Sequence, residues 1–181
     1  MSYLKLKQNM IDMIREQQIK LGYRSEAVRL YYPRQSLNRF LDNTAGVDEL
    51  QELLSGICEE LSKTIGEVTV SHQGERFCFL FSPKVSDYVH EHMEGAEFIQ
   101  DFVAEVSRHG AKLEDVLAVF YRYSDHVHVE RVAQGDFDYV VYFEDGIPDS
   151  YRYCITDEGC HIIYHRFTEE DYRDFTIPSQ F

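Results

Sequence analysis

The spacing of apolar residues changes along this 181-residue chain, and this change constrains the fold more than any other feature. Apolar residues recur at steps of three and four in the N-terminal third and again between residues 85 and 123, a spacing typical of amphipathic helices. They follow a period of two between residues 67 and 81 and again from 126 to 167, which is typical of strands. Helices and strands therefore come in blocks, and this order favours an α+β fold over an alternating α/β fold.

The pattern places each element approximately. We predict helices at 3–21, 34–41, 47–65, 85–93, 96–109 and 113–123, an extended segment at 28–32, strands at 67–71, 75–81, 126–132, 137–144, 151–156 and 160–167, and a short helix from about residue 168. The predicted fold class is α+β, with a mostly antiparallel sheet of about six strands packed against several helices. No repeat or linker interrupts the pattern, so we expect residues 1–181 to form a single domain.

Two short segments give more specific expectations. In the strand at 75–81, Phe77, Phe79 and Phe81 alternate with Cys78 and Leu80, so both faces are apolar. This predicts a central strand that is covered on both sides. At the start of the last helix, residues 168–171 have the form of a capping box, in which a threonine side chain accepts a hydrogen bond from a backbone N–H three residues later.

Charge is distributed unevenly. The chain carries 32 acidic and 18 basic side chains, a net charge of −14, yet residues 1–39 hold eight basic and only three acidic ones. The acidic remainder repels nucleic acids and anionic membranes, so the segment 1–41 is the one part that could meet them. The alternative is that this basic helical region packs on the acidic α+β body of its own chain or of a second copy.

The predicted first helix has an apolar stripe that something must cover. The stripe comprises Leu6, Met10, Met13, Ile14 and Leu21. A protein partner or self-association through this N-terminal helix, as in a homodimer, would cover it, and so would the rest of the chain. We expect apolar contacts to dominate here, because exposed ion pairs contribute typically under about 1 kcal/mol each.

The location that the sequence favours is the cytoplasm. The longest apolar runs, 77–81 and 116–121, are far shorter than the roughly 20 residues of a membrane helix, and no secretory signal pattern is present. The four cysteines include no CxxC pair, which fits reduced thiols in a soluble intracellular protein. We therefore expect no membrane partner.

A metal site is one candidate for function. His126 and His128 lie two residues apart on a predicted strand, and Glu130 extends the same face, so the three side chains could reach one Zn²⁺ or Fe²⁺ ion. The alternative is a polar, solvent-facing strand surface. A second candidate zinc site is the group Cys154, Cys160, His161 and His165. Strand geometry argues against it, because a turn at 157–159 would place the two cysteines on one face and the two histidines on the other.

A ligand site is the other candidate. Arg29, Tyr31, Tyr32 and Arg34 surround Pro33 in an irregular segment. Arginine and tyrosine tips on such a segment could bind an anionic ligand.

No nucleotide-binding, hydrolase or zinc-protease signature occurs in the chain, and its ten glycines form no phosphate-binding cluster. The leading hypothesis is therefore a non-enzymatic cytosolic domain, without a cofactor, that binds a partner protein or a small ligand. The first alternative is a metal-dependent hydrolase that uses His126 and His128. The second is a nucleic-acid-associated regulator that acts through the basic N-terminal region.

Residues 28–40, VRLYYPRQSLNRF, followed by the leucine-rich helix from Val47, resemble a small family of uncharacterised bacterial domains from Firmicutes. The resemblance covers roughly the first third of the chain. It implies a bacterial cytosolic setting, and it contributes no catalytic residues because no activity is assigned to the family.

We predict that the protein binds DNA and RNA weakly or not at all at physiological salt. The acidic part of the chain opposes approach, and the basic side chains at 24, 29, 34 and 39 are spaced so that no regular element aligns them. Titration of labelled DNA and RNA at several salt concentrations measures this. Submicromolar binding with a steep salt dependence that Arg29→Glu removes would contradict the prediction.

Overall fold

The computed structural model describes residues 3–133 and 135–176, except the side chain of Thr176, and its backbone contacts divide the chain into two compact units. Unit 1 is Met1–Met93 and unit 2 is Glu94–Phe181. Each unit combines helices with an antiparallel sheet, so the α+β class is confirmed. The single domain expected from the sequence stays a prediction. No helix in the described ranges is long and apolar enough to cross a membrane.

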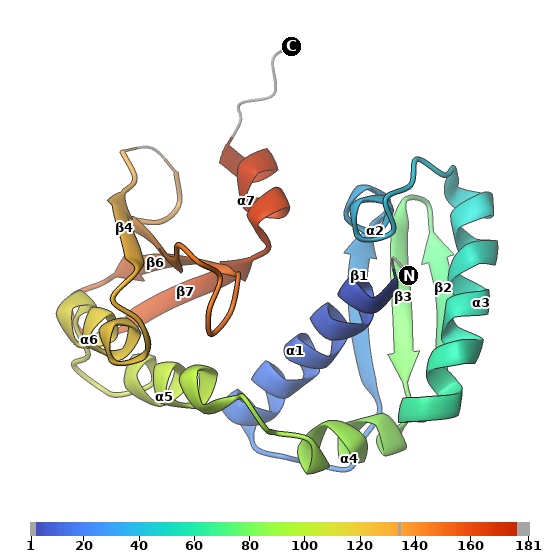
Figure 1. Ribbon diagram of the computed structural model, residues 1–181, viewed down its shortest axis with the longest axis horizontal. Coiled ribbons are helices and arrows are strands. Elements are labelled where there is room, and N and C mark those ends of the chain that lie inside the picture. Colours follow the sequence, from blue (N-terminus) through green and yellow to red (C-terminus); the bar gives the residue numbers. More distant parts are fainter. Residues whose placement is uncertain (1–2, 134, 177–181) are drawn as a thin grey trace. The chain divides into compact units, whose positions relative to one another are not determined.

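Unit 1 consists of four helices and a three-stranded sheet within its described residues. In chain order they are α1 (Tyr3–Leu21), β1 (Val28–Pro33), α2 (Arg34–Phe40), α3 (Val47–Ile65), β2 (Val68–Gln73), β3 (Arg76–Phe81) and α4 (Pro83–Glu91). The strand order is β1-β3-β2, with antiparallel pairing on both sides of β3 (Figure 1). The register places Val28 of β1 and Val68 of β2 opposite Phe81 of β3.

The core of unit 1 lies on one face of this sheet. Phe77, Phe79 and Phe81 are fully buried there. The apolar residues that join them in one cluster come from all four helices and both outer strands, and include Leu6, Met10, Ile14, Val28, Leu37, Leu50, Leu54, Leu61, Ile65, Val68, Val85 and Val89. The helices therefore cover the phenylalanine face.

The other face of the same sheet is open within unit 1. The prediction of a central strand is confirmed, since β3 has a neighbour on each side. The expected cover on both faces is wrong for unit 1, because Leu80 is 38% exposed and Cys78 is only half-buried. The flanking positions explain this: Leu80 lies between Arg29 of β1 and Thr69 of β2, and these polar residues favour contact with water.

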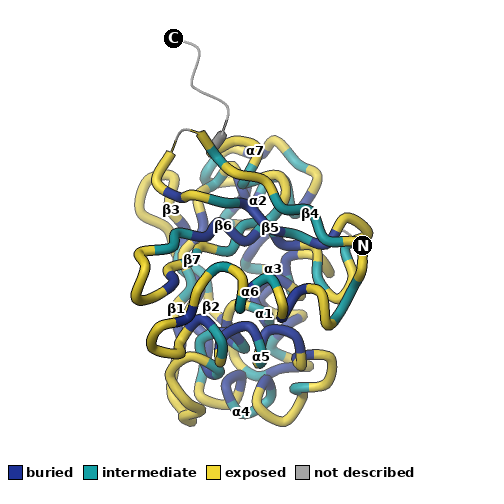
Figure 2. Tube along the Cα trace, turned by 90° about the vertical axis from the view of Figure 1, so that its left-hand side faces the viewer, coloured by how far each residue is buried: buried dark blue, intermediate teal, exposed yellow. Residues whose placement is uncertain are grey.

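Unit 2 contains three helices and a four-stranded sheet among the residues that the structure describes. They are α5 (Glu97–Val106), α6 (Leu113–Tyr123), β4 (Val127–Arg131), β5 (Tyr139–Phe143), β6 (Arg152–Asp157), β7 (Ile162–Phe167) and α7 (Glu169–Thr176). The strands form an antiparallel meander in the order β4-β5-β6-β7. Buried positions concentrate in β5 and β6, the two central strands (Figure 2).

Aromatic rings fill one face of this sheet. Phe98 of α5 packs edge-to-face on Phe143 and Tyr153 at ring-centroid distances of 4.9 and 5.8 Å, and Phe120 of α6 lies 5.1 Å from Phe143. On the opposite face, a smaller cluster includes Phe137, Val140, Cys154, Phe167 and Tyr172. α7 contributes the last of these, and its predicted cap is confirmed, because the backbone N–H of Asp171 donates to Thr168 Oγ1 at 3.1 Å.

The expectation of one sheet of about six strands is corrected to two sheets of three and four strands. The segment at 28–33, which contains the proline, joins the first sheet as β1 by pairing with β3. The last four strands pair only with their sequence neighbours. Three helices separate the two blocks along the chain, and each sheet buries its apolar face against helices of its own unit.

The register of the last hairpin also differs from the prediction. Cys154 lies directly opposite His165, and Thr156 opposite Ile163. The turn therefore spans 158–161 rather than 157–159, so Cys154 shares a face with His165 and Cys160 lies in the turn. The shift of three residues exchanges the faces of β7, because side chains alternate with a period of two.

The first helix packs within unit 1. Leu6, Met10 and Ile14 are buried in the core, whereas Met13 and Leu21 of the same predicted stripe are exposed. Its charged residues pair mainly along the helix: Lys20 Nζ lies 2.8 Å from Glu16 Oε1, and Arg15 Nη1 lies 3.3 Å from Asp12 Oδ1. Apolar burial therefore anchors α1, and two of its four basic side chains, Arg15 and Lys20, pair with acidic side chains of the same helix.

We predict that Met10→Asp lowers the free energy of unfolding of unit 1 by about 3 kcal/mol or more, because it removes apolar burial and places a charge in the core. Met13→Asp on the same helix is the matched control, since Met13 is 37% exposed and Met10 only 1%. The control is expected to cost less than about 1 kcal/mol. Urea unfolding followed by circular dichroism compares the two variants, and equal losses would contradict the packing of α1.

Candidate functional site

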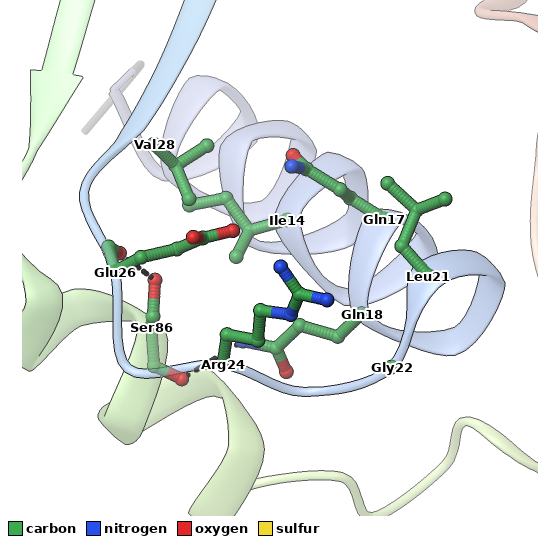
Figure 3. A pocket seen from close by; sticks show the side chains of 9 residues that line it. All are labelled: Ile14, Gln17, Gln18, Leu21, Gly22, Arg24, Glu26, Val28 and Ser86. Atoms are coloured by element: carbon green, nitrogen blue, oxygen red, sulfur yellow. Dashed lines mark hydrogen bonds between the residues drawn. The ribbon is translucent and has the colours of Figure 1, made fainter.

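A pocket of about 260 Å³ lies in unit 1 between the C-terminal half of α1, the segment that leads into β1, and α4 (Figure 3). Its lining comprises Ile14, Gln17, Gln18, Leu21, Gly22, Arg24, Glu26, Val28 and Ser86. Three of these are aliphatic, two carry charge, and the rest are amides, a hydroxyl and a glycine. The pocket is smaller than the roughly 300–1,000 Å³ of sites for drug-sized ligands.

The pairing of β1 with β3 positions this pocket. Val28 lies opposite Phe81, and α4 begins two residues after Phe81, so the chain before β1 runs beside the first turns of α4. Gly22 has a φ of +83° directly after the end of α1, and this left-handed conformation turns the chain back toward the sheet.

Several contacts fix the segment 23–26 to α4. The Tyr23 hydroxyl donates to Asp87 Oδ1 at 2.6 Å, and the Tyr23 ring stacks on His90 with centroids 3.8 Å apart. Hydrogen bonds from Ser25 and from Tyr23 lower the pKa of Asp87, so it accepts both as a carboxylate. Ser86 Oγ donates to the backbone carbonyl of Glu26 at 2.7 Å. One wall of the pocket is therefore held in place.

Gln18 forms a buried polar part of the lining. Its side-chain amide Nε2 donates to the backbone carbonyl of Ser86 at 2.9 Å. Because that carbonyl can only accept, the nitrogen of the amide must face it, which fixes the position of the amide oxygen. Oε1 is buried and has no hydrogen-bond partner among the described residues, and Gln18 as a whole is only 9% exposed.

Arg24 and Glu26 bring both signs of charge to the pocket. In Figure 3 the Arg24 guanidinium and the Glu26 carboxylate extend from the loop toward α1. Neither side chain forms an ion pair or hydrogen bond within the described residues, and both are exposed. Ile14, Leu21 and Val28 provide apolar surface in the same lining. Chemically, the arrangement offers an anion-binding group, a cation-binding group, a buried acceptor and an apolar wall.

The predicted ligand residues around Pro33 separate in the structure. Arg29 and Tyr31 lie on the open face of the sheet, where the Arg76 guanidinium lies 4.6 Å from the centre of the Tyr31 ring. Tyr32 points the opposite way into the core, and its hydroxyl donates to Asn9 Oδ1 at 2.7 Å. Side chains alternate along a strand, so Arg29 and Tyr31, two residues apart, share one face, whereas Tyr32 lies on the other.

Arg34 is separate from both groups. It begins α2, its Nη2 lies 3.1 Å from Glu75 Oε1, and its Nη1 donates to the carbonyl of Ala45 at 3.3 Å. The structure therefore brings Arg29 together with Tyr31 only, and their role as an anion site stays a prediction.

The predicted metal residues lie in and before β4. His128 Nε2 is 3.6 Å from Glu130 Oε2, and its Nδ1 is 3.7 Å from Glu144 Oε1. The carboxylates of Glu130 and Glu144 thus approach opposite nitrogens of the His128 ring, so these three side chains do not converge on one point. His126 lies directly before β4, and its backbone N–H donates to Ser124 Oγ.

Across the described residues, no group of three or more His, Cys, Asp and Glu side chains is arranged to hold a metal ion. His128 instead stacks on the Tyr142 ring with centroids 4.7 Å apart, and the Arg152 guanidinium lies over the same ring at 3.6 Å. The assignment of a metal to His126, His128 and Glu130 stays a prediction that direct metal analysis can decide.

Sequence reasoning did not identify the pocket residues. Eight of the nine lie between residues 14 and 28, where the end of α1 and the loop after it fold back on each other, and the ninth, Ser86, comes from α4. One signal was present: a glycine that ends a helix is followed within four residues by an arginine and a glutamate. That signal is too common in loops to mark a site by itself.

A family model described as "Domain of unknown function, E. rectale Gene description (DUF3877)" matches residues 3–176 of the chain. No curated protein matches the chain, and no solved structure does.

We predict substoichiometric zinc, iron and manganese in untagged protein purified without chelators, because the carboxylates beside His128 face different ring nitrogens. Elemental analysis by plasma mass spectrometry measures the ratio of metal to protein. A ratio near one that His128→Ala abolishes, while Met13→Ala leaves it intact, would contradict this prediction and favour the metal-dependent hydrolase.

Proposed function

Because the chain belongs to the family of domains of unknown function DUF3877, whose description assigns no activity, we propose a function from the pocket of unit 1: a non-enzymatic domain that binds a small zwitterionic ligand. The family match extends the resemblance of residues 28–40 to almost the whole chain. The proposed location is the cytoplasm, which the four unpaired cysteines support.

The observation that carries the proposal is the unpartnered oxygen of Gln18. A buried acceptor without a hydrogen bond costs about 1–3 kcal/mol, so buried polar atoms are nearly always paired. Gln18 Oε1 is buried and has no partner among the described residues, and Gln18 is one of the residues that line this pocket. A ligand that places an N–H or O–H group there would recover this cost.

The charges beside Gln18 define the ligand further. A guanidinium binds a carboxylate through two parallel hydrogen bonds, so Arg24 suits the anionic end of a ligand. Glu26 suits an ammonium group, and the aliphatic wall suits an apolar side chain. An α-amino acid with an apolar side chain combines these groups in a volume that suits a pocket of about 260 Å³.

The composition of the lining supports binding rather than catalysis. Among the nine lining residues, no imidazole, thiol or phenol could serve as a nucleophile or a general base. The hydroxyl of Ser86 already donates to the backbone of Glu26, which is a structural role. Glu26 is the only carboxylate of the lining, and no second titratable acid accompanies it.

We predict that L-leucine or L-methionine binds with a dissociation constant in the millimolar range or tighter, measured by saturation-transfer NMR and calorimetry. Leucinamide lacks the carboxylate and 4-methylpentanoate lacks the ammonium, so each analogue removes one proposed contact. Arg24→Gln is expected to weaken leucine binding by at least about tenfold, equivalent to about 1.4 kcal/mol, and to leave leucinamide binding unchanged. Glu26→Gln is expected to weaken leucine binding by a similar factor and to leave the binding of 4-methylpentanoate, which lacks the ammonium, unchanged.

Arg29→Gln is the matched control, because Arg29 is also exposed but lies on β1 outside the pocket lining. Its binding should equal that of the unaltered protein. If no probe binds at about 10 mM, or if Arg24→Gln and Glu26→Gln bind leucine unchanged, the proposed ligand class is wrong.

A further inference from the structure

The turn between β6 and β7 gathers a thiol, an imidazole and a carboxylate in sequence. Cys160 Sγ lies 3.1 Å from His161 Nδ1, and His161 Nε2 lies 2.7 Å from Glu158 Oε2. The three side chains thus form a hydrogen-bonded series in which the imidazole stands between the sulfur and the carboxylate. The cysteine is exposed, and both partners are about half-exposed.

Backbone hydrogen bonds hold this turn in its conformation. The N–H of Glu158 donates to the carbonyl of His161 at 3.1 Å, and the N–H of Gly159 donates to Asp157 Oδ1 at 2.8 Å. The carbonyl of Cys160 accepts from the N–H of Gly110, 50 residues earlier, at 2.9 Å. The turn is therefore anchored to a second segment of unit 2.

The carboxylate determines the protonation of the imidazole. An ionised carboxylate only accepts hydrogen bonds, so His161 Nε2 must carry a proton where it meets Glu158. In the neutral ring, Nδ1 is then the unprotonated nitrogen, and it faces the thiol of Cys160. A nucleophile next to a base that a third group orients is the arrangement that activates cysteine in nucleophilic catalysis.

The other cysteines lack this environment. Burial raises the pKa of Cys58 and of Cys154 to about 12, which keeps both thiols protonated at neutral pH. Cys78 is half-buried on the open face of the three-stranded sheet, opposite Tyr31 and Ser71. Only Cys160 joins exposure to an adjacent base among the four thiols.

We propose that Cys160 is a reactive thiol that forms mixed disulfides with small disulfide compounds, with His161 as its base and Glu158 as a positioning residue. The thiol proton passes to Nδ1 of His161, and the sulfur attacks one sulfur of R–S–S–R. A new S–S bond forms while the S–S bond of the reagent breaks. The leaving thiolate takes the proton from the imidazolium and departs as RSH, so the disulfide is the only oxidant required.

The surroundings define the disulfides that react best. An exposed turn imposes little steric selection, whereas Asp157 and Glu158 carry negative charge in the same hairpin, within a chain of net charge −14. Neutral and cationic disulfides should therefore react faster than anionic ones, and added salt should reduce the difference.

The test treats the whole protein with bis(2-hydroxyethyl) disulfide, which is neutral, and follows each cysteine by peptide mass spectrometry at about pH 7. One hydroxyethylthio group is expected at Cys160, and Cys160→Ser abolishes it. His161→Gln is expected to slow the modification at least about fivefold, less than the factor of about 10² or more that a general base provides in an enclosed site, because the turn is open to solvent.

His165→Gln is the matched control, since His165 lies on β7 opposite Cys154 and away from the turn. Its rate should equal that of the unaltered protein. Glu158→Gln should slow the modification at about pH 7, whereas the rates of all variants should converge near pH 9.5, where thiols ionise without a base. A purely structural effect of Glu158 would persist at every pH.

Equal rates for His161→Gln and the unaltered protein at about pH 7, or modification of Cys78 as fast as that of Cys160, would overturn the proposal. All of these variants change exposed residues, and their melting temperatures test whether slower modification comes from unfolding. Failure of this test leaves the proposed ligand pocket unaffected, because the pocket lies in unit 1 and contains no cysteine.

Discussion

Unit 1 depends on the burial of Phe77, Phe79 and Phe81 on one face of β3. Three fully buried aromatic side chains in one strand require a continuous apolar cover, and four helices provide it. The same strand must find two neighbours, and it takes β2 through a hairpin and β1 from the distant N-terminal segment. The pairing with β1 is the long-range contact that closes unit 1, because it returns the chain after α1 to the sheet.

The candidate pocket is a consequence of that closure. The register sets Val28 opposite Phe81, and the residues before Val28 must then cross the first turns of α4. Tyr23 and Glu26 fix this crossing through Asp87, His90 and Ser86, which leaves Gln18 of α1 beneath the loop with its amide oxygen unpaired. Packing thus explains the position of the pocket. The charged side chains of Arg24 and Glu26 are not needed for packing, and they determine which ligand groups the pocket could bind.

Unit 2 buries the apolar face of its sheet without a long-range strand pairing. Its strands pair only with sequence neighbours, so its core forms from local hairpins and from the aromatic rings that α5 and α6 lay on Phe143 and Tyr153. Local pairing frees the turns from a role in the core. The β6–β7 turn can therefore hold exposed Cys160, His161 and Glu158 in a hydrogen-bonded series without cost to the packing.

The amino-acid sequence by itself determined the α+β class, the extent of the long helices, the central position of β3 and the cap of α7, because each follows from local periodicity or from contacts within four residues. Only the tertiary structure decided the division into two sheets, the β6–β7 register and the grouping of Gln18, Arg24 and Glu26. A shift of three residues in a turn leaves local patterns acceptable while it exchanges the faces of a strand. The pocket has no periodic signal, since residues 14–28 fold back against Ser86 of α4 only after β1 pairs with β3.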